Sequence, residues 1–205
     1  MKYQLRDYQK KASDAAVMCF KMKSGRNGLL VLPTGAGKSL IIADIAARLE
    51  EPLIVFQPNK EILEQNFAKL QTYGIWDCSI YSASVGRKEI SRITFATIGS
   101  VIRHMKDFQH FKNILIDECH LVKPSDGMYK RFFEQAERRI VGLTATPYRL
   151  YSCMNGSMRK FLTRTRPRVF SQVLYYCQVS ELLAKGFLSR LKYYDVTRID
   201  LTKVR

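Results

Sequence analysis

The feature that most constrains this chain is an apolar run that ends in a glycine-rich turn followed by lysine and serine. The apolar residues 29–32 are typical of a buried strand in a parallel sheet, and the turn leads into a helical pattern over residues 40–49. Two glycines let backbone N–H groups curl around an anion, while the lysine can reach phosphates and the serine hydroxyl suits Mg²⁺. The predicted phosphate-binding loop comprises Pro33, Thr34, Gly35, Ala36, Gly37, Lys38 and Ser39.

One position of the loop departs from the full phosphate-binding pattern. Leu32 stands where the pattern has its first glycine. The motif alone therefore leaves open a second interpretation, a glycine-rich turn that happens to precede a lysine. Other motifs in the chain are needed to distinguish a phosphate-binding loop from an ordinary turn.

A strong positive charge indicates the class of partner. The 205 residues carry a formal net charge of +16, which favours a polyanion such as nucleic acid. Two alternatives stay open, because the charge could balance an acidic remainder of a longer protein or serve solubility. No apolar run approaches the roughly 20 residues that span a membrane, and five cysteines are scattered singly. We therefore expect a cytoplasmic protein with reduced thiols and no membrane contact.

Short apolar runs alternate with helical patterns along the chain. Strands are predicted at residues 52–56, 76–81, 93–96, 113–116 and 138–143, and a helix over residues 5–22 precedes the first strand. This alternation predicts an α/β fold with a mostly parallel sheet, helices on both faces and ligands at the carboxyl edge of the sheet. We expect one domain over residues 1–150. A basic loop, a helix over residues 180–185 and a strand over residues 187–196 would follow within residues 151–205.

Polar side chains follow two of these strands directly. The strand at residues 113–116 runs into Asp117 and Glu118, which could hold Mg²⁺ and activate an attacking water. His120 follows, and the strand at residues 138–143 ends in Thr144 and Thr146, which could relay the nucleotide state. Each residue also has an ordinary interpretation. Asp117 and Glu118 could be solvated acids at a strand end, His120 could be a structural imidazole, and Thr144 and Thr146 could simply serve the turn.

Two further features have both a functional and an ordinary interpretation. Gln9, on the first helix, offers the donor and the acceptor that adenine recognition needs, although a lone glutamine on a helix is usually solvated. Residues 138–180 contain no acid while arginines and aromatic residues accumulate, which suits phosphate contacts or a mobile loop.

Taken in order, these motifs resemble those of the first RecA-like domain of superfamily 2 helicases and translocases. The resemblance implies a RecA-like P-loop NTPase fold that binds ATP and Mg²⁺, with Lys38, Asp117 and Glu118 as catalytic residues and Ser39 and Asp117 as metal ligands. It adds Arg6 and Gln9 to the nucleotide contacts. The implied coupling residues are His120, Thr144 and Thr146, and the implied nucleic-acid contacts are Gln57, Pro58, Asn59, Thr97, Gly99 and Ser100.

The Asp-Glu-Cys-His form of the acidic motif is similar to that of RadD-type helicases and of the motor subunits of type I and type III restriction enzymes. This resemblance implies an ATP hydrolase that acts on DNA, duplex or branched, in preference to RNA. In the family a second RecA-like domain supplies arginine fingers, and we expect that domain to be missing here and the isolated chain to hydrolyse ATP weakly. The alternatives are an ATP switch that binds nucleic acid without productive unwinding, and the motor part of a restriction enzyme.

Overall fold

The computed structural model describes residues 4–22, 26–153 and 156–190, and its centre is an eight-stranded sheet. The strand order is β10-β1-β7-β6-β2-β5-β3-β4, and every neighbouring pair is parallel except β3 with β4. This confirms the predicted mostly parallel α/β sheet. The strands are β1 (Gly28–Val31), β2 (Leu53–Phe56), β3 (Cys78–Ser82), β4 (Arg87–Lys88), β5 (Ile93–Ala96), β6 (Asn113–Ile116), β7 (Arg139–Thr144) and β10 (Gln172–Tyr176).

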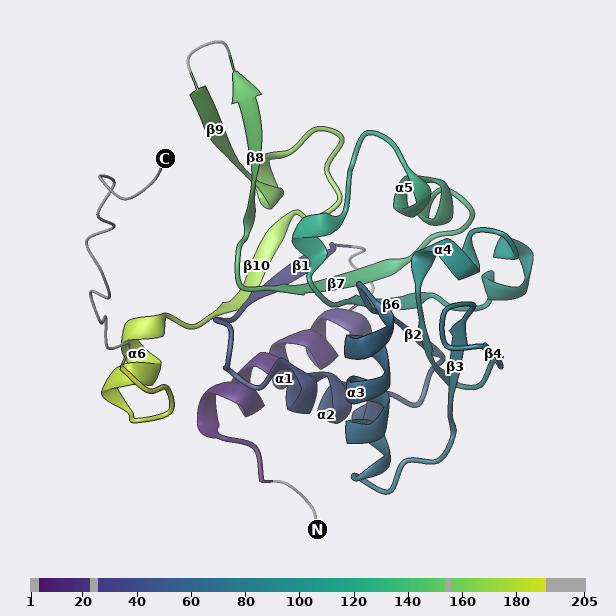
Figure 1. Ribbon diagram of the computed structural model, residues 1–205, viewed down its shortest axis with the longest axis horizontal. Coiled ribbons are helices and arrows are strands. Elements are labelled where there is room, and N and C mark those ends of the chain that lie inside the picture. The colour runs from purple at the N-terminus through teal and green to yellow at the C-terminus, as the bar shows by residue number, and fades with distance from the viewer. Residues whose placement is uncertain (1–3, 23–25, 154–155, 191–205) are drawn as a thin grey trace, which may run out of the picture.

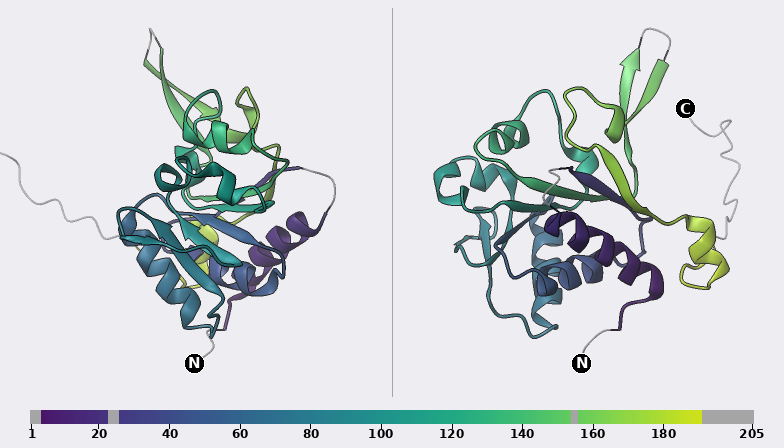
Figure 2. Two further views of the ribbon diagram at one scale, coloured as in Figure 1. Left: turned by 90° about the vertical axis from the view of Figure 1, so that its right-hand side faces the viewer. Right: turned by 180° about the vertical axis from the view of Figure 1, so that it is seen from behind.

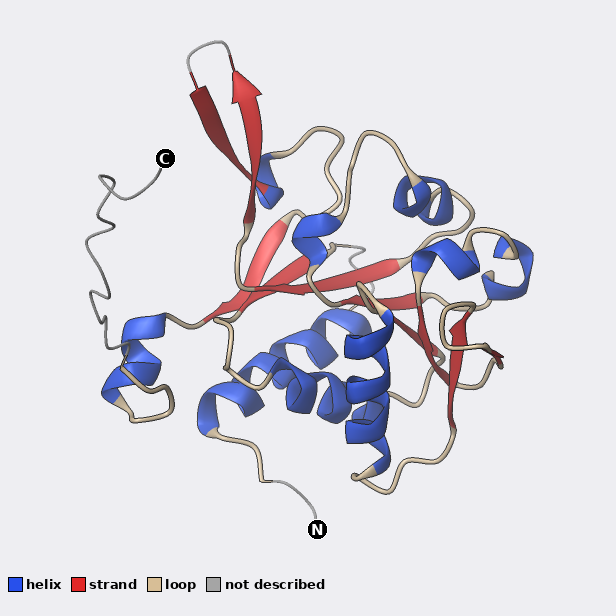
Figure 3. Ribbon diagram, viewed as in Figure 1, coloured by secondary structure: helices blue, strands red, loops and turns tan. Residues whose placement is uncertain are grey.

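Helices cover both faces of this sheet, so the domain has three layers (Figures 1 and 2). One face carries α1 (Asp7–Lys21), α2 (Lys38–Arg48) and α3 (Lys60–Gln71). The other carries α4 (Ile98–Val101), α5 (Met128–Phe133) and the single turns Met105–Phe108 and Cys119–Leu121 (Figure 3).

The two faces have separate hydrophobic cores, and strand β2 shows how one sequence serves both. Leu53 and Val55 join the core under α1 to α3, whereas Ile54 and Phe56 join the core on the opposite face. Successive side chains of a strand point to opposite faces, so a strand buried on both sides needs apolar residues at every position. The continuous apolar runs in the sequence reflect this double burial.

The chain beyond β7 differs from the expected loop. Strands β8 (Tyr148–Cys153) and β9 (Gly156–Phe161) pair as an antiparallel hairpin, followed by the turn Leu162–Arg164. Strand β10 then joins the sheet at its edge beside β1. Just before β10, Val169 O accepts a hydrogen bond from the Asn27 side chain over 3.0 Å, and the same side chain accepts from Ile140 N over 2.8 Å. These contacts join residues far apart in sequence, which local patterns do not reveal.

Two other segments also differ from the expectation, and one helix agrees with it to within one residue. Helix α5 had no strong local signal, and α6 (Val179–Ala184) lies one residue from its predicted position. Residues 187–190 form no strand, and the remainder of the strand expected over residues 187–196 lies outside the described residues. The division at residue 150 stays a prediction, although the sheet continues past it through β10. No helix in the described part is long and apolar enough to cross a membrane.

Candidate nucleotide-binding site

The glycine-rich turn connects β1 to the first residue of α2. Gly35 and Gly37 have φ angles of +82° and +76°, a region that side chains disfavour, and the N–H of Ala36 donates to Pro33 O over 3.1 Å to close the turn. Within the described part of the chain, the backbone N–H groups of Gly35, Gly37, Lys38 and Ser39 donate to no protein acceptor. Free N–H groups at a helix N-terminus fit a phosphate.

The start of α1 holds this loop in place. The Gln9 Nε2 amide and the Tyr8 hydroxyl both donate to Ala36 O over 3.0 Å, and Gln9 Oε1 accepts from Arg6 N over 2.9 Å. A Cβ at Gly37 would lie 2.5 Å from Gln9 Nε2, so a larger residue there would displace the Gln9 amide and strain the turn. Gln9 is buried rather than solvated. Its adenine-reading role stays a prediction, and the structure adds that its amide supports the phosphate-binding loop.

We predict that Gln9→Ala raises the KM for ATP about 5-fold, because the lost hydrogen bond to Ala36 O contributes roughly 1 kcal/mol to the position of the loop. Steady-state hydrolysis by the full-length protein measures this change. Gln135→Ala, at an exposed glutamine after α5, is the matched control. Equal KM values for the Gln9 variant and the wild type would contradict the supporting role.

The acidic motif lies opposite the loop, at the carboxyl end of β6. Lys38 Nζ and Glu118 Oε1 are 2.8 Å apart, and His120 Nδ1 lies 3.3 Å from Glu118 Oε2. Glu118 itself adopts a left-handed conformation (φ +47°), which costs a non-glycine residue free energy and re-aims its side chain. The lysine and the carboxylate that the sequence places 80 positions apart are therefore direct neighbours.

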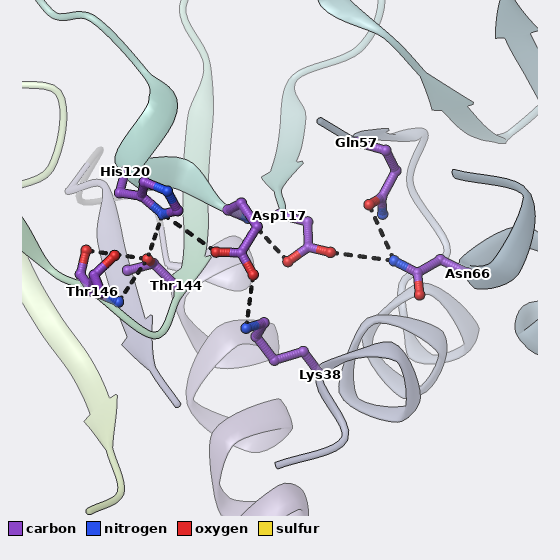
Figure 4. A network of polar contacts seen from close by, with 8 residues as sticks. Lys38, Gln57, Asn66, Asp117, His120, Thr144 and Thr146 are labelled. Carbon is purple, nitrogen blue, oxygen red and sulfur yellow. Dashed lines mark hydrogen bonds and ion pairs between the residues drawn. The ribbon is translucent and has the colours of Figure 1, made fainter. Parts of the chain in front are cut away.

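A hydrogen-bond chain continues from the acidic motif to the loop after β7 (Figure 4). His120 Nδ1 and Thr144 Oγ1 are 3.0 Å apart, and Thr144 Oγ1 also accepts from Thr146 N over 3.0 Å. Lys38, Glu118, His120 and Thr144 thus form one continuous polar network. The structure brings the proposed catalytic and coupling residues together, while their roles stay predictions.

Asp117 is buried behind this network, with 6% of its surface exposed. Its carboxylate accepts from Asn66 Nδ2 over 3.2 Å and from Glu118 N over 3.0 Å. Burial, reinforced by the charge of Glu118, raises the pKa of Asp117 to about 6. Among the described residues no cation forms an ion pair with this carboxylate. A buried carboxylate of this kind fits a divalent cation, which would offset its charge.

Asn66, on α3, is a member of the site that the sequence motifs missed. Its Nδ2 donates both to Asp117 and to Gln57 Oε1, the latter over 3.1 Å. It shares the buried stripe of α3 with Leu63 and Phe67. A polar residue within an otherwise apolar helix stripe was the signal that could have identified it.

The raised pKa of Asp117 predicts that stability falls as pH rises from about 4 to about 6, since the folded protein keeps a proton that the unfolded chain has released. Asp117→Asn should remove up to about 3 kcal/mol of this dependence and leave the protein more stable than wild type at pH 7. Denaturant unfolding at pH 4.5 and 7 measures it.

Asp14→Asn is the control, because hydrogen bonds from Lys10 and Arg48 lower the pKa of Asp14 from its usual 3.8, so its contribution is lost only at lower pH and this variant should keep the wild-type change in stability between pH 4.5 and 7. An Asp117→Asn variant whose stability follows the wild-type pH dependence would contradict the assignment.

The predicted nucleic-acid residues gather beside this site with one exception. A cavity of about 530 Å³ is lined by Pro58, Asn59, Thr97, Gly99 and Ser100, together with the cations Lys60, Lys88 and Arg103. Asn59 also caps α3, and Ser100 Oγ lies 3.0 Å from Thr97 Oγ1. Gln57 is 1% exposed and contacts Asn66, and it lines not this cavity but a neighbouring one of about 490 Å³, together with Pro58, Thr97 and Gly99.

Comparisons with known proteins identify relatives of this chain. The family model described as "Type III restriction enzyme, res subunit" matches residues 2–149. The chain is 29% identical over 151 residues to the DNA 3'-5' translocase XPB2 of Sulfurisphaera tokodaii, covering 72% of this chain and 32% of that protein. It is also 29% identical over 154 residues to the DNA 3'-5' helicase XPB of Mycobacterium tuberculosis, covering 70% and 27%. The chain thus spans about a third of these relatives or less.

A solved structure shows a similar fold. The Type ISP restriction-modification enzyme LlaGI, in complex with a DNA substrate mimic, matches with a TM-score of 0.65 and 14% identity, covering 89% of this chain and 18% of that one. At this identity the likeness concerns the fold alone.

Proposed function

Because the chain belongs to the family of type III restriction enzyme Res subunits, we propose that it is the ATP-binding half of a superfamily 2 motor that moves along or unwinds DNA. The observation that carries this proposal is the network from Lys38 through Glu118 and His120 to Thr144, because it connects the phosphate-binding loop to the loop that leads toward the rest of the motor. A solvated acid pair would not need these partners.

In the proposed site, the N–H groups of the glycine-rich turn and Lys38 bind the phosphates of ATP. Ser39 and Asp117 hold Mg²⁺, which when bound neutralises phosphate charge. Glu118 accepts a proton from the attacking water. Lys38 and His120 orient the Glu118 carboxylate, because each contacts a different one of its two oxygens. Thr144 and Thr146 are hydrogen-bonded to each other, and Thr144 to His120, so a change in the position of His120 is passed on to the loop after β7.

DNA is the proposed polyanion. The net charge of +16 and the cations that line the 530 Å³ cavity support a nucleic acid, and the names of the XPB relatives specify DNA. We further propose that a second RecA-like domain completes the site with arginine residues, since the curated relatives are about three times the length of the matched segment or more.

The test is ATP hydrolysis by the full-length protein with duplex DNA, forked DNA, single-stranded DNA and RNA. We expect DNA to raise the turnover rate and RNA to leave it near the basal value. Equal stimulation by RNA would overturn the DNA preference. Tight binding of ATP and DNA with no stimulated turnover would instead support the switch that the sequence left as an alternative.

A further inference from the structure

The β8–β9 hairpin, residues 148–153 and 156–161, projects away from the three-layered domain (Figure 1). Leu150 is 65% exposed and lies opposite Arg159, whereas Met158 is 61% exposed and lies opposite Tyr151. Neighbouring strand positions point to opposite faces, so these apolar side chains are exposed on both faces of the hairpin. Exposed large apolar residues on both faces indicate a surface that contacts a partner.

The charge of the hairpin identifies the chemistry of that partner. The Arg159 guanidinium lies 5.5 Å from the Tyr148 ring centroid, and Lys160 Nζ lies 5.5 Å from that of Tyr151. Each face therefore presents an aromatic ring beside a cation. No acid occurs between residues 138 and 180 to neutralise them. Aromatic and apolar surface beside cations suits stacked bases and their phosphates.

The base of the hairpin is fixed to both loops of the nucleotide site. Arg149 Nη1 donates to Val122 O over 3.0 Å, at the end of the turn that follows the acidic motif. Leu162 N donates to Pro147 O over 2.9 Å, directly after Thr146, and the Leu162 side chain is buried in the core. The hairpin thus projects from a base that is anchored to the turn after the acidic motif and to the loop after β7.

We propose that this hairpin binds unpaired bases where a DNA duplex opens, and so forms a second nucleic-acid contact apart from the 530 Å³ cavity. The inference rests on the proposed DNA motor function. Bases within a duplex present only their edges in the grooves, whereas unpaired bases at a fork expose the flat faces that Leu150 and Met158 can cover. Arg159 and Lys160 then pair with the adjoining phosphates.

The test uses full-length protein and fluorescence anisotropy with a forked DNA and a blunt duplex of equal length. The Leu150→Ser/Met158→Ser variant should bind the fork about 10-fold more weakly, because each face of the hairpin loses an apolar side chain that covers a base, and the duplex within 2-fold of wild type. Arg159→Ala/Lys160→Ala should weaken both complexes and lower the slope of log affinity against log salt by about two.

Lys11→Ala/Met18→Ser on α1 is the matched control, because Met18 is also 65% exposed and lies on the opposite side of the sheet. Unchanged fork binding by the Leu150→Ser/Met158→Ser variant would overturn the inference and leave a protein as the partner of the apolar surface. An equal loss of affinity for fork and duplex in the Leu150→Ser/Met158→Ser variant would also overturn the inference. Basal ATP hydrolysis should be unchanged in both hairpin variants. A wild-type protein whose ATP hydrolysis no DNA stimulates would refute the motor function, and this outcome is distinct from failure of the hairpin inference.

Discussion

Replacing Glu118 by glutamine is expected to lower the DNA-stimulated rate of ATP hydrolysis at least 100-fold while ATP still binds. Glutamine keeps the shape of the side chain but cannot accept a proton from water, and general-base catalysis contributes about 10²–10⁴-fold. The substitution also replaces the charged partner of Lys38 and His120 with a neutral amide. The turnover number should therefore fall much more than the affinity for nucleotide.

The companion variant Lys38→Ala should separate binding from chemistry. We expect it to weaken ATP binding as well as turnover, because the ammonium is the phosphate-binding charge of the loop. Glu134→Gln, at an exposed acid paired with Lys130 on α5, is the control and should hydrolyse ATP at the wild-type rate. Retention of stimulated turnover by Glu118→Gln would show that another group activates the water.

Local sequence patterns predicted which residues lie at this edge of the sheet because each of its parts is encoded over a few residues. An apolar strand followed by Asp117 and Glu118, or by the turn at Gly35 and Gly37, needs no knowledge of distant residues. The contacts between these parts are different. The 2.8 Å ion pair of Lys38 with Glu118 depends on the strand order, in which β7 lies between β1 and β6.

The parts that local patterns missed depend on packing between distant segments. Strand β10 has little apolar alternation, and Asn27, more than 140 positions away, fixes the segment before it. The hairpin has no buried face, so hydrophobic periodicity could not indicate its strands. Gln9 was predicted as a possible ligand contact, but its bond to Ala36 O could be recognised only when the helix and the loop were both in place.

Gly142, in the centre of β7, is a position where a substitution should cost much stability. A Cβ there would lie 2.6 Å from Cys119 Sγ and 2.8 Å from both Cys119 Cβ and Phe170 Cε1. Cys119 and Phe170 are buried and belong to the same core, so neither can move into solvent. The acidic motif therefore packs on the sheet only because this strand position has no side chain.

We predict that Gly142→Val lowers the free energy of unfolding by about 3 kcal/mol, at the upper end for overpacked cores, and the melting temperature by roughly 6–12 °C. Thermal unfolding followed by circular dichroism measures this change. Gly99→Ala is the control, because a Cβ on that helical glycine meets no atom within 4 Å. Cys119→Ala should recover part of the loss in the smaller variant Gly142→Ala, since it removes the Sγ that the new Cβ meets. A Gly142→Val variant as stable as the control would show that the core beside Glu118 can expand, and the packing of Cys119 would then not hold the acidic motif in position.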